Sequence, residues 1–330
     1  MARILHLLEQ NADYPTRRMA VSLAEELRER FTPVGLTIGR GGDLRNVLDA
    51  GRCLENFEPT AVVHAWGTRP LIAAALAGRQ PFVFSPPAEI NRWDRFWMRW
   101  LCGRGVNVVF ASEGQRKRSG LIGAGQVIRP GVHVRAADGP YAPLRQWLGF
   151  TGGDFVVLAP GESTRSAGHD IALWTTAIAH MRDPTWRLLL WGRGNRVEHL
   201  RHVTRPLRLP ALMRFQPDVE FEQLISAADV VLAPRGGAEA DLPTALCMAE
   251  GVPVIEIGSP RATAQKLLEI RGDAARRKLL GQRAAEDAGK FFGMDRFAAG
   301  YAAMYAQCLR GNETGIERGV GASGLIIHGH

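Results

Sequence analysis

The chain has 330 residues, of which 46% are hydrophobic and 22% charged, with a formal net charge of +8 and a pI near 9.8. This composition is typical of a globular protein and excludes a fibrous or disordered one, and the length is enough for two domains. No apolar run approaches the roughly 18 residues of a membrane-spanning helix. The first residues, MARILHLLEQ, lack the apolar segment and cleavage site of a signal peptide, so we expect a cytoplasmic protein.

The positive charge does not by itself indicate a nucleic-acid partner. Only four of the 41 basic residues are lysines, and the arginines are spread along the chain without a zinc-finger or RNP pattern. We therefore expect no nucleic-acid binding. The cysteines (Cys53, Cys102, Cys247 and Cys308) form no CxxC pair and the histidines are scattered, so we expect reduced thiols and no metal site.

Buried strands are expected where short apolar runs stand between turn signals. In chain order, strands are predicted at 3–8, 34–38, 61–66, 81–85, 106–111, 126–129, 154–159, 186–191, 212–216, 229–233 and 252–257. Helices are predicted at 16–31, 68–78, 88–102, 169–182, 221–227 and 243–250, with several more after residue 260. Strands that alternate with helices indicate parallel sheets built from βαβ units, and these are too many strands for one sheet. The predicted fold is therefore α/β, with two Rossmann-like domains.

The segment RPGVHVRAADGPYAP at 129–143 is rich in Pro and Gly, lacks periodicity and is the expected linker. We therefore predict an N-terminal domain at 1–130 and a C-terminal domain at 131–310. The last twenty residues contain six glycines and no periodic pattern, so 311–330 is predicted to be a flexible tail.

Residues 91–100, NRWDRFWMRW, place Trp93, Phe96, Trp97 and Trp100 at i, i+3, i+4 and i+7, with arginines beside that stripe. An aromatic face packed on the first sheet explains the pattern, and this is the favoured interpretation. The alternative is a helix that lies in a membrane interface and gives the protein a peripheral membrane contact.

The segment VVLAPRGGAEADLPTALCMAEGVPVI at 230–255 predicts a strand, a Gly-rich loop, a helix and a strand, an arrangement typical of ligand sites in open α/β sheets. Its frame, VVLAP followed by MAEGVPVI, resembles the donor domain of GT-B glycosyltransferases of the retaining "group 1" family. FVVLAPGESTRSAGHDIALWTTAIAHM at 155–181 and WRLLLWGRG at 186–194 resemble earlier donor-domain loops in the right order, and VIRPGV at 127–132 resembles the interdomain segment. The resemblance covers about residues 1–308.

This resemblance implies two Rossmann-like domains facing a cleft, with the last helix crossing back to the first domain. It implies a nucleotide-sugar donor as co-substrate, an unknown glycan or lipid-linked acceptor, and neither cofactor nor metal. The donor phosphates would meet basic side chains and a helix N-terminus, whose free N–H groups favour anions. A lipid-linked acceptor would place the protein at the inner face of the membrane.

The candidate site residues lie in the loops that match the family's site, and several of them replace family residues that this sequence lacks. The candidate donor-binding residues are Gly161, Glu162, Arg165, Gly192, Arg193, Arg235, Gly236, Gly237 and Thr244. Glu239 and His64 are the candidate catalytic residues. For His64 the alternative is a structural histidine at a strand end.

The match departs from the family at positions that carry its chemistry. The two glutamates of the donor loop, eight positions apart, should stand at Ala238 and Leu246, and neither of these side chains accepts a hydrogen bond. Glu162 and Ala167 occupy the positions of a basic pair for the donor phosphates. A carboxylate repels a diphosphate at short range, so the donor motif is degenerate.

Two hypotheses follow. In the first, the protein is a retaining glycosyltransferase with a reworked donor site that uses Arg235, Arg165 and the N–H groups of Gly236 and Gly237. In the second, it is an inactive pseudo-enzyme that keeps the fold as a binding or scaffold module. A GT-B epimerase of nucleotide sugars is a third possibility, which needs a carboxylate of the donor loops to meet His64.

Overall fold

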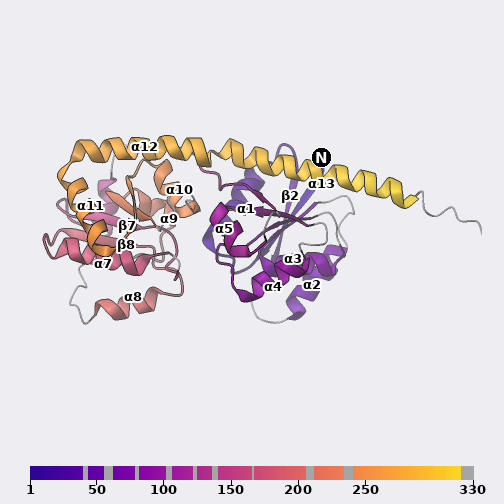
Figure 1. Cartoon of the computed structure of the whole chain (residues 1–330), viewed down its shortest axis with the longest axis horizontal. Helices are drawn as coiled ribbons and strands as arrows, with labels where there is room; N and C mark the ends of the chain where they lie inside the picture. The colour runs from indigo at the N-terminus through magenta and orange to yellow at the C-terminus, as the bar shows by residue number, and fades with distance from the viewer. Residues whose placement is uncertain are drawn as a thin grey trace, which may run out of the picture. The chain divides into compact units, whose positions relative to one another are not determined.

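A computed structural model describes residues 1–39, 44–55, 62–78, 82–101, 106–121, 125–135, 140–165, 167–205, 212–233 and 241–320, with side chains to residue 310 (Figure 1). The chain divides into two compact units. Unit 1 contains Met1–Arg129 and Asp295–His330, and unit 2 contains Pro130–Met294. Each unit has one parallel sheet flanked by helices, which confirms the predicted α/β class with two Rossmann-like sheets.

Unit 1 is built on a sheet of order β2-β1-β3-β4-β5-β6. The strands are β1 (Arg3–Glu9), β2 (Thr32–Ile38), β3 (Val62–Trp66), β4 (Phe82–Ser85), β5 (Asn107–Phe110) and β6 (Gln126–Val127). The helices are α1 (Tyr14–Glu26), α2 (Leu44–Glu55), α3 (Thr68–Leu76), α4 (Arg92–Leu101), α5 (Glu113–Ser119) and, from the end of the chain, α13 (Met294–Val320). Since β2 and β3 lie on opposite sides of β1, the strand order reverses there.

The two faces of this sheet carry different chemistry because successive strand residues point to opposite sides. One face is apolar: Leu7 and Ala65 pack in a buried cluster with Leu71 of α3 and Met98 of α4. The other face carries His6 and His64, which are paired in register on β1 and β3. It is this second face that receives α13.

A buried polar network holds α13 on unit 1, along which the helix lies in Figure 1. His64 Nδ1 is 2.6 Å from the Tyr305 hydroxyl, and His64 Nε2 is 2.9 Å from the Ser85 hydroxyl. The Ser85 hydroxyl is in turn 3.0 Å from the hydroxyl of Tyr301. Burial lowers the pKa of His64 well below its usual range and that of His6 to about 4, so both rings are neutral at pH 7.

Unit 2 is built on a sheet of order β11-β10-β7-β8-β9. The strands are β7 (Phe155–Ala159), β8 (Trp186–Leu190), β9 (Met213–Phe215), β10 (Val230–Ala233) and β11 (Val254–Glu256). The helices are α6 (Ala142–Trp147), α7 (His169–His180), α8 (Val197–Thr204), α9 (Phe221–Ile225), α10 (Leu242–Ala249), α11 (Pro260–Gly272) and α12 (Ala274–Phe292). The strands β7 and β8 form the centre of its core, as their predominantly apolar sequences predict.

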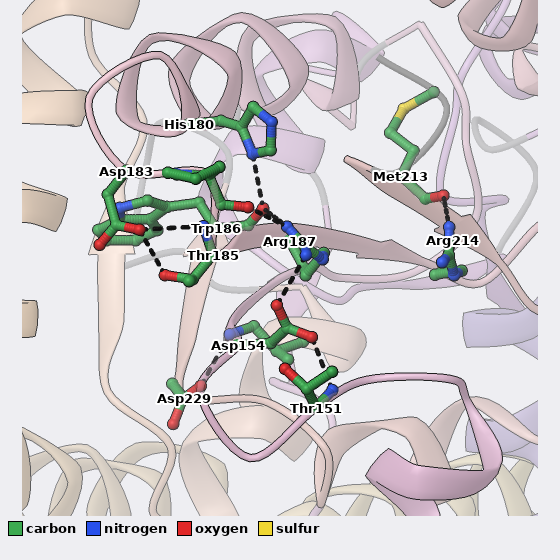
Figure 2. A network of polar contacts seen from close by, with 12 residues as sticks. Thr151, Asp154, His180, Asp183, Thr185, Trp186, Arg187, Met213, Arg214 and Asp229 are labelled. Carbon is green, nitrogen blue, oxygen red and sulfur yellow. Dashed lines mark hydrogen bonds and ion pairs between the residues drawn. The ribbon is translucent and has the colours of Figure 1, made fainter.

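A polar network ties together the amino ends of the unit 2 strands (Figure 2). Arg187 of β8 lies 2.9 Å from the Asp154 carboxylate just before β7, and that carboxylate also accepts the N–H of Thr151 at 2.7 Å. Asp229, just before β10, accepts the N–H of Val156 at 2.7 Å. These bonds fix the edge of the sheet opposite to the carboxyl ends of the strands, so they stabilise the frame of the candidate site without belonging to it.

The end of the chain differs from the predicted ranges. The structure places Asp295 and all that follows with unit 1, whereas the sequence predicts one domain from 131 to 310. Helix α13 also continues to Val320, ten residues into the predicted tail, and 321–330 lie outside the described residues. Three of the six glycines, Gly311, Gly315 and Gly319, lie in this helix, which tolerates them because a glycine costs a helix only about 1 kcal/mol.

Helix α4 does not bury its aromatic stripe. Trp93, Phe96 and Trp100 are 73%, 57% and 51% exposed, while the helix buries Met98 and Leu101 against the sheet. The packed-face interpretation is therefore wrong for these three residues, and only Trp97 is half-buried. Among the described helices, none is both long enough and apolar enough to span a bilayer.

Replacing Tyr305 by Phe tests the buried network. The change removes the partner of a buried ring nitrogen, so we expect the free energy of unfolding to fall by about 1–3 kcal/mol in denaturant titrations. The matched control is Tyr141→Phe at a tyrosine that is 58% exposed, where we expect a change within about 0.5 kcal/mol. Equal effects of the two substitutions would show that the network does not hold α13.

Candidate functional site

The candidate site of unit 2 lies where its strand order reverses. The chain goes from β7 to β8 on one side, while β10 lies hydrogen-bonded to the other side of β7. In open α/β sheets, ligands bind outside the carboxyl ends of the strands at such a reversal. The loop after β7 and the start of α10 lie at this edge. The predicted Arg235, Gly236, Gly237 and Glu239 fall in 234–240, outside the described residues.

The loop after β7 is built against the first turn of α10. Gly161 is buried with φ of +77°, and a Cβ at this position would stand 3.0 Å from Cγ of Pro243. A side chain here would meet both backbone strain and a close neighbour, so the position requires glycine. Thr244, one residue further along α10, is buried. The structure thus brings the predicted Gly161 and Thr244 to the same edge.

The loops after β7 and β8 are joined through the Ser163 peptide. Its N–H donates to the carbonyl of Arg193 at 2.6 Å, and its carbonyl accepts the N–H of Arg196 at 2.8 Å. Gly194 passes so close that a Cβ there would stand 2.5 Å from the Ser163 carbonyl oxygen. Gly192, with φ of +78°, allows the turn that precedes this contact. These contacts therefore hold the loop after β7 against the loop after β8.

The buried side chain of His169 holds the loop after β7 in place through two hydrogen bonds. Its Nε2 lies 3.1 Å from the Pro160 carbonyl, which only accepts, so Nε2 carries the proton and Nδ1 accepts from the Ser163 hydroxyl at 2.8 Å. The ring is buried, and burial lowers its pKa to about 4. A neutral, fully bonded histidine positions Ser163 and is not available for proton transfer.

The basic side chains at this edge differ in what they contact. Arg165 is exposed and forms no ion pair with any residue that the structure describes. The guanidinium of Arg193 lies over the Trp191 ring at 4.7 Å, and its Nε donates to the Pro217 carbonyl at 3.0 Å. Glu162 is half-buried beside them. Of the two arginines, Arg165 is therefore the one that can bind an anion without losing a contact to another described residue.

The start of α10 departs from the expected anion site. Asp241 caps the helix, and its carboxylate accepts the N–H of Thr244 at 3.0 Å. Pro243 has no N–H to offer. The positions of Pro243 and Thr244 therefore offer no free N–H group to an anion. The carboxylate of Asp241 also places a negative charge at the positive end of the helix dipole. Asp241 is not among the predicted site residues, although the sequence DLPT carries the usual signs of a capped N-terminus.

The structure describes one of the two predicted catalytic residues, His64. Glu239 lies outside the described residues. His64 is fully buried in unit 1 and bonded on both nitrogens, to Tyr305 and Ser85. This placement favours the structural alternative for His64. The second glutamate position of the family is Leu246, half-buried on α10.

Unit 1 has its own reversal point at the carboxyl ends of β1 and β3. Glu9 ends β1, and its carboxylate lies 3.9 Å from the Arg69 guanidinium at the start of α3. Gly67, with φ of +107°, lets the chain pass beside that carboxylate. Burial raises the pKa of Glu9, an effect that Arg69 partly opposes. Neither residue is among the predicted site residues, although the last residue of a first strand is a usual place for ligand contacts.

Metal-binding groups do not gather in either unit. Among the residues that the structure describes, no three His, Cys, Asp or Glu side chains are placed to hold an ion. The described cysteines, Cys53, Cys247 and Cys308, are free thiols.

Similarity to known proteins lies in the structure and not in the sequence. No protein-family model matches the sequence, and no curated protein matches it. Anabaena HepE in complex with UDP-glucose superposes with a TM-score of 0.76 at 17% identity, covering 93% of this chain and 100% of that one. Sucrose-phosphate synthase from Thermosynechococcus elongatus has a TM-score of 0.71 at 15% identity (92% and 98% covered). A glycosyltransferase from Rickettsia africae has 0.69 at 15% (93% and 98% covered).

Gly194→Ala tests the contact between the two loops. Alanine at a positive φ costs about 1–2 kcal/mol anywhere, and at Gly194 it also meets the Ser163 backbone. Gly149→Ala is the matched control, because Gly149 also has a positive φ but no atom within 4 Å of its Cβ position. We expect a clearly larger loss of unfolding free energy for Gly194→Ala in denaturant titrations. Equal losses would contradict the close approach.

The buried His169 predicts a pH dependence of stability. Its pKa falls from 6.5 to about 4 on folding, so the unfolded chain takes up the proton first as the pH drops. Stability is therefore present above pH 6.5 and is lost toward pH 4, by about 2 kcal/mol at pH 5 for this group.

In His169→Asn, we expect the difference in unfolding free energy between pH 7 and pH 5 to shrink by about that amount. The control is His202→Asn, at an exposed histidine of α8. An unchanged pH dependence in His169→Asn would contradict the neutral, buried ring.

Proposed function

We propose that this chain, which has the GT-B fold, is a glycosyltransferase that takes a sugar from a nucleotide-sugar donor and transfers it to a glycan or lipid-linked acceptor. The donor occupies unit 2 at the carboxyl ends of β7 and β10. Transfer proceeds with retention of the anomeric configuration, as in the family that the sequence resembles. The reaction uses no resident cofactor or metal and takes place in the cytoplasm, where the free thiols remain reduced.

One observation supports the proposal more than any other: the donor-side edge keeps its loop architecture although its motif residues have changed. Gly161, Gly192 and Gly194 all have positive φ values, which favour glycine. A Cβ would come close to the Pro243 side chain at Gly161 and to backbone atoms at Gly192 and Gly194. Loops of this kind let a backbone approach a ligand closely. The solved HepE structure, similar over 93% of this chain, contains UDP and glucose, which points to the same class of donor here.

The donor phosphates would be bound mainly by side chains. Arg165 meets the diphosphate as an exposed cation, and Arg235 and the amides of Gly236 and Gly237 complete the site from the other loop. Because Asp241 caps α10, the helix dipole contributes less than the resemblance implies. Charge-assisted bonds from arginine, worth roughly 1.5–3 kcal/mol each, replace it. Glu239 is the proposed carboxylate at the reacting sugar.

The acceptor would meet unit 1 at its own reversal point. The Glu9 carboxylate, with a raised pKa, and the Arg69 guanidinium form a half-buried polar pair there. Such a pair suits hydroxyl groups of a glycan, because one partner accepts and the other donates hydrogen bonds.

The alternative function is a catalytically inactive GT-B module that binds a partner or ligand. It is favoured by the carboxylate of Asp241 at the start of α10 and by the apolar Leu246 at the second glutamate position. Both features lower the affinity of unit 2 for a nucleoside diphosphate. The two functions differ in whether a sugar is transferred and not in the fold.

Ligand-induced stabilisation tests the proposed donor site. We expect one nucleotide-sugar among UDP-, GDP-, ADP- and dTDP-linked donors to raise the melting temperature, since a ligand that binds only the folded state stabilises it. Arg165→Ala should weaken that ligand by about tenfold or more. The matched control is Arg182→Ala, at an exposed arginine shortly before the amino end of β8, away from the carboxyl ends of the strands.

The outcomes separate the two functions. A stabilising donor that is hydrolysed or transferred, with activity lost in Glu239→Gln, supports the enzyme. A stabilising donor that is neither hydrolysed nor transferred supports the inactive module. No shift with any donor, or equal weakening by Arg165→Ala and Arg182→Ala, would overturn the donor site.

A further inference from the structure

The exposed side of α4 is the largest feature of unit 1 that the proposed function does not use. We define the α4 surface as Arg92, Trp93, Arg95, Phe96, Arg99 and Trp100. All six are exposed, and the three aromatic residues among them keep more than half of their area open to solvent. Single exposed aromatic residues are ordinary, but three on one helix face indicate an interaction site.

The α4 surface is exposed because the helix faces the sheet with its other side. Met98 and Leu101 fill the core, and Asp94 turns inward, where its carboxylate accepts the N–H of Asn91 at 2.8 Å. The only acid of the helix is thereby removed from the exposed side. What remains there is strictly basic and aromatic.

The positive charge of the α4 surface is not neutralised by any residue that the structure describes. Arg92, Arg95 and Arg99 form no ion pair with any described residue. The Arg99 guanidinium lies against Gly120, the C-cap of α5, and so draws the exposed Lys117 and Arg118 of that helix into the same basic region. The arginines and aromatic rings together line an open hollow.

We propose that the α4 surface docks unit 1 onto an anionic lipid bilayer. Tryptophan and phenylalanine enter the boundary between headgroups and acyl chains, while arginines contact lipid phosphates from the same helix. Helix α4 lies along the bilayer plane. The proposal does not depend on the proposed function, since it uses no residue of the donor or acceptor sites.

Charge complementarity decides for lipid over other occupants. A second copy of the chain on the same face would set arginines against arginines, which is repulsive. An acidic protein would match the charges but does not account for three exposed aromatic rings beside three arginines on one helix. A bilayer satisfies both halves of the pattern.

Vesicle flotation tests the proposal on the full chain. We expect binding to vesicles of phosphatidylcholine with phosphatidylglycerol, little binding to phosphatidylcholine alone, and release at high salt. Arg92→Ala/Arg95→Ala should lower the partition coefficient by about tenfold or more. The control Arg182→Ala/Arg205→Ala removes the same charge from exposed positions of unit 2 and should bind as the unchanged protein does.

The aromatic half has its own control. Trp93→Ala/Trp100→Ala should lower binding in proportion to the lost apolar contact, whereas Trp147→Ala/Trp174→Ala, at exposed tryptophans of unit 2, should not. Absence of vesicle binding, equal binding to neutral vesicles, self-association lost in the α4 variants, or preference for single-stranded RNA would overturn the proposal. Nucleotide-sugar stabilisation should persist in the α4 variants, so failure here is separable from failure of the donor site.

Discussion

The backbone contact between Ser163 and the loop of Gly194 is the constraint on which the shape of unit 2 at the carboxyl ends of β7 and β8 depends. Two hydrogen bonds and a glycine without room for a Cβ join loops that follow different strands. His169 then fixes Ser163 from the core side. Because these contacts involve backbone and buried groups, the edge keeps its shape while the exposed residues around it change. The GT-B fold can therefore persist while the exposed residues of these loops change.

Unit 1 uses buried polar chemistry for a different purpose. His6 and His64 are placed on the strand face that receives α13, and the hydrogen bonds of His64 require the hydroxyls of Tyr305 and Ser85. An apolar face would accept a helix in several positions, whereas a fully bonded network accepts one. The network therefore specifies where the last helix packs as well as stabilising it.

Sequence patterns predict the strands, their parallel pairing and the loop that follows β7, because these depend on local hydrophobicity and glycine. They do not predict that His64 faces Tyr305, since the partners are 241 positions apart. Sequence patterns wrongly predict that the aromatic side chains of α4 are buried. The spacing of these residues shows that they share one side of the helix, but it does not show which side packs on the sheet. Asp241 is not predicted as a site residue because it lies between Ala238 and Leu246, the family's two glutamate positions, and matches neither of them.

Placing α13 in unit 1 has a consequence for synthesis. The first 129 residues leave the ribosome long before the helix that covers their second sheet face, and all of unit 2 is made in between. Unit 2 is contiguous in sequence and has everything it needs to fold at once. Until α13 is made, His6, His64 and Trp66 of unit 1 remain exposed to solvent. Truncation or stalling before this helix therefore leaves unit 1 prone to aggregation and to chaperone binding.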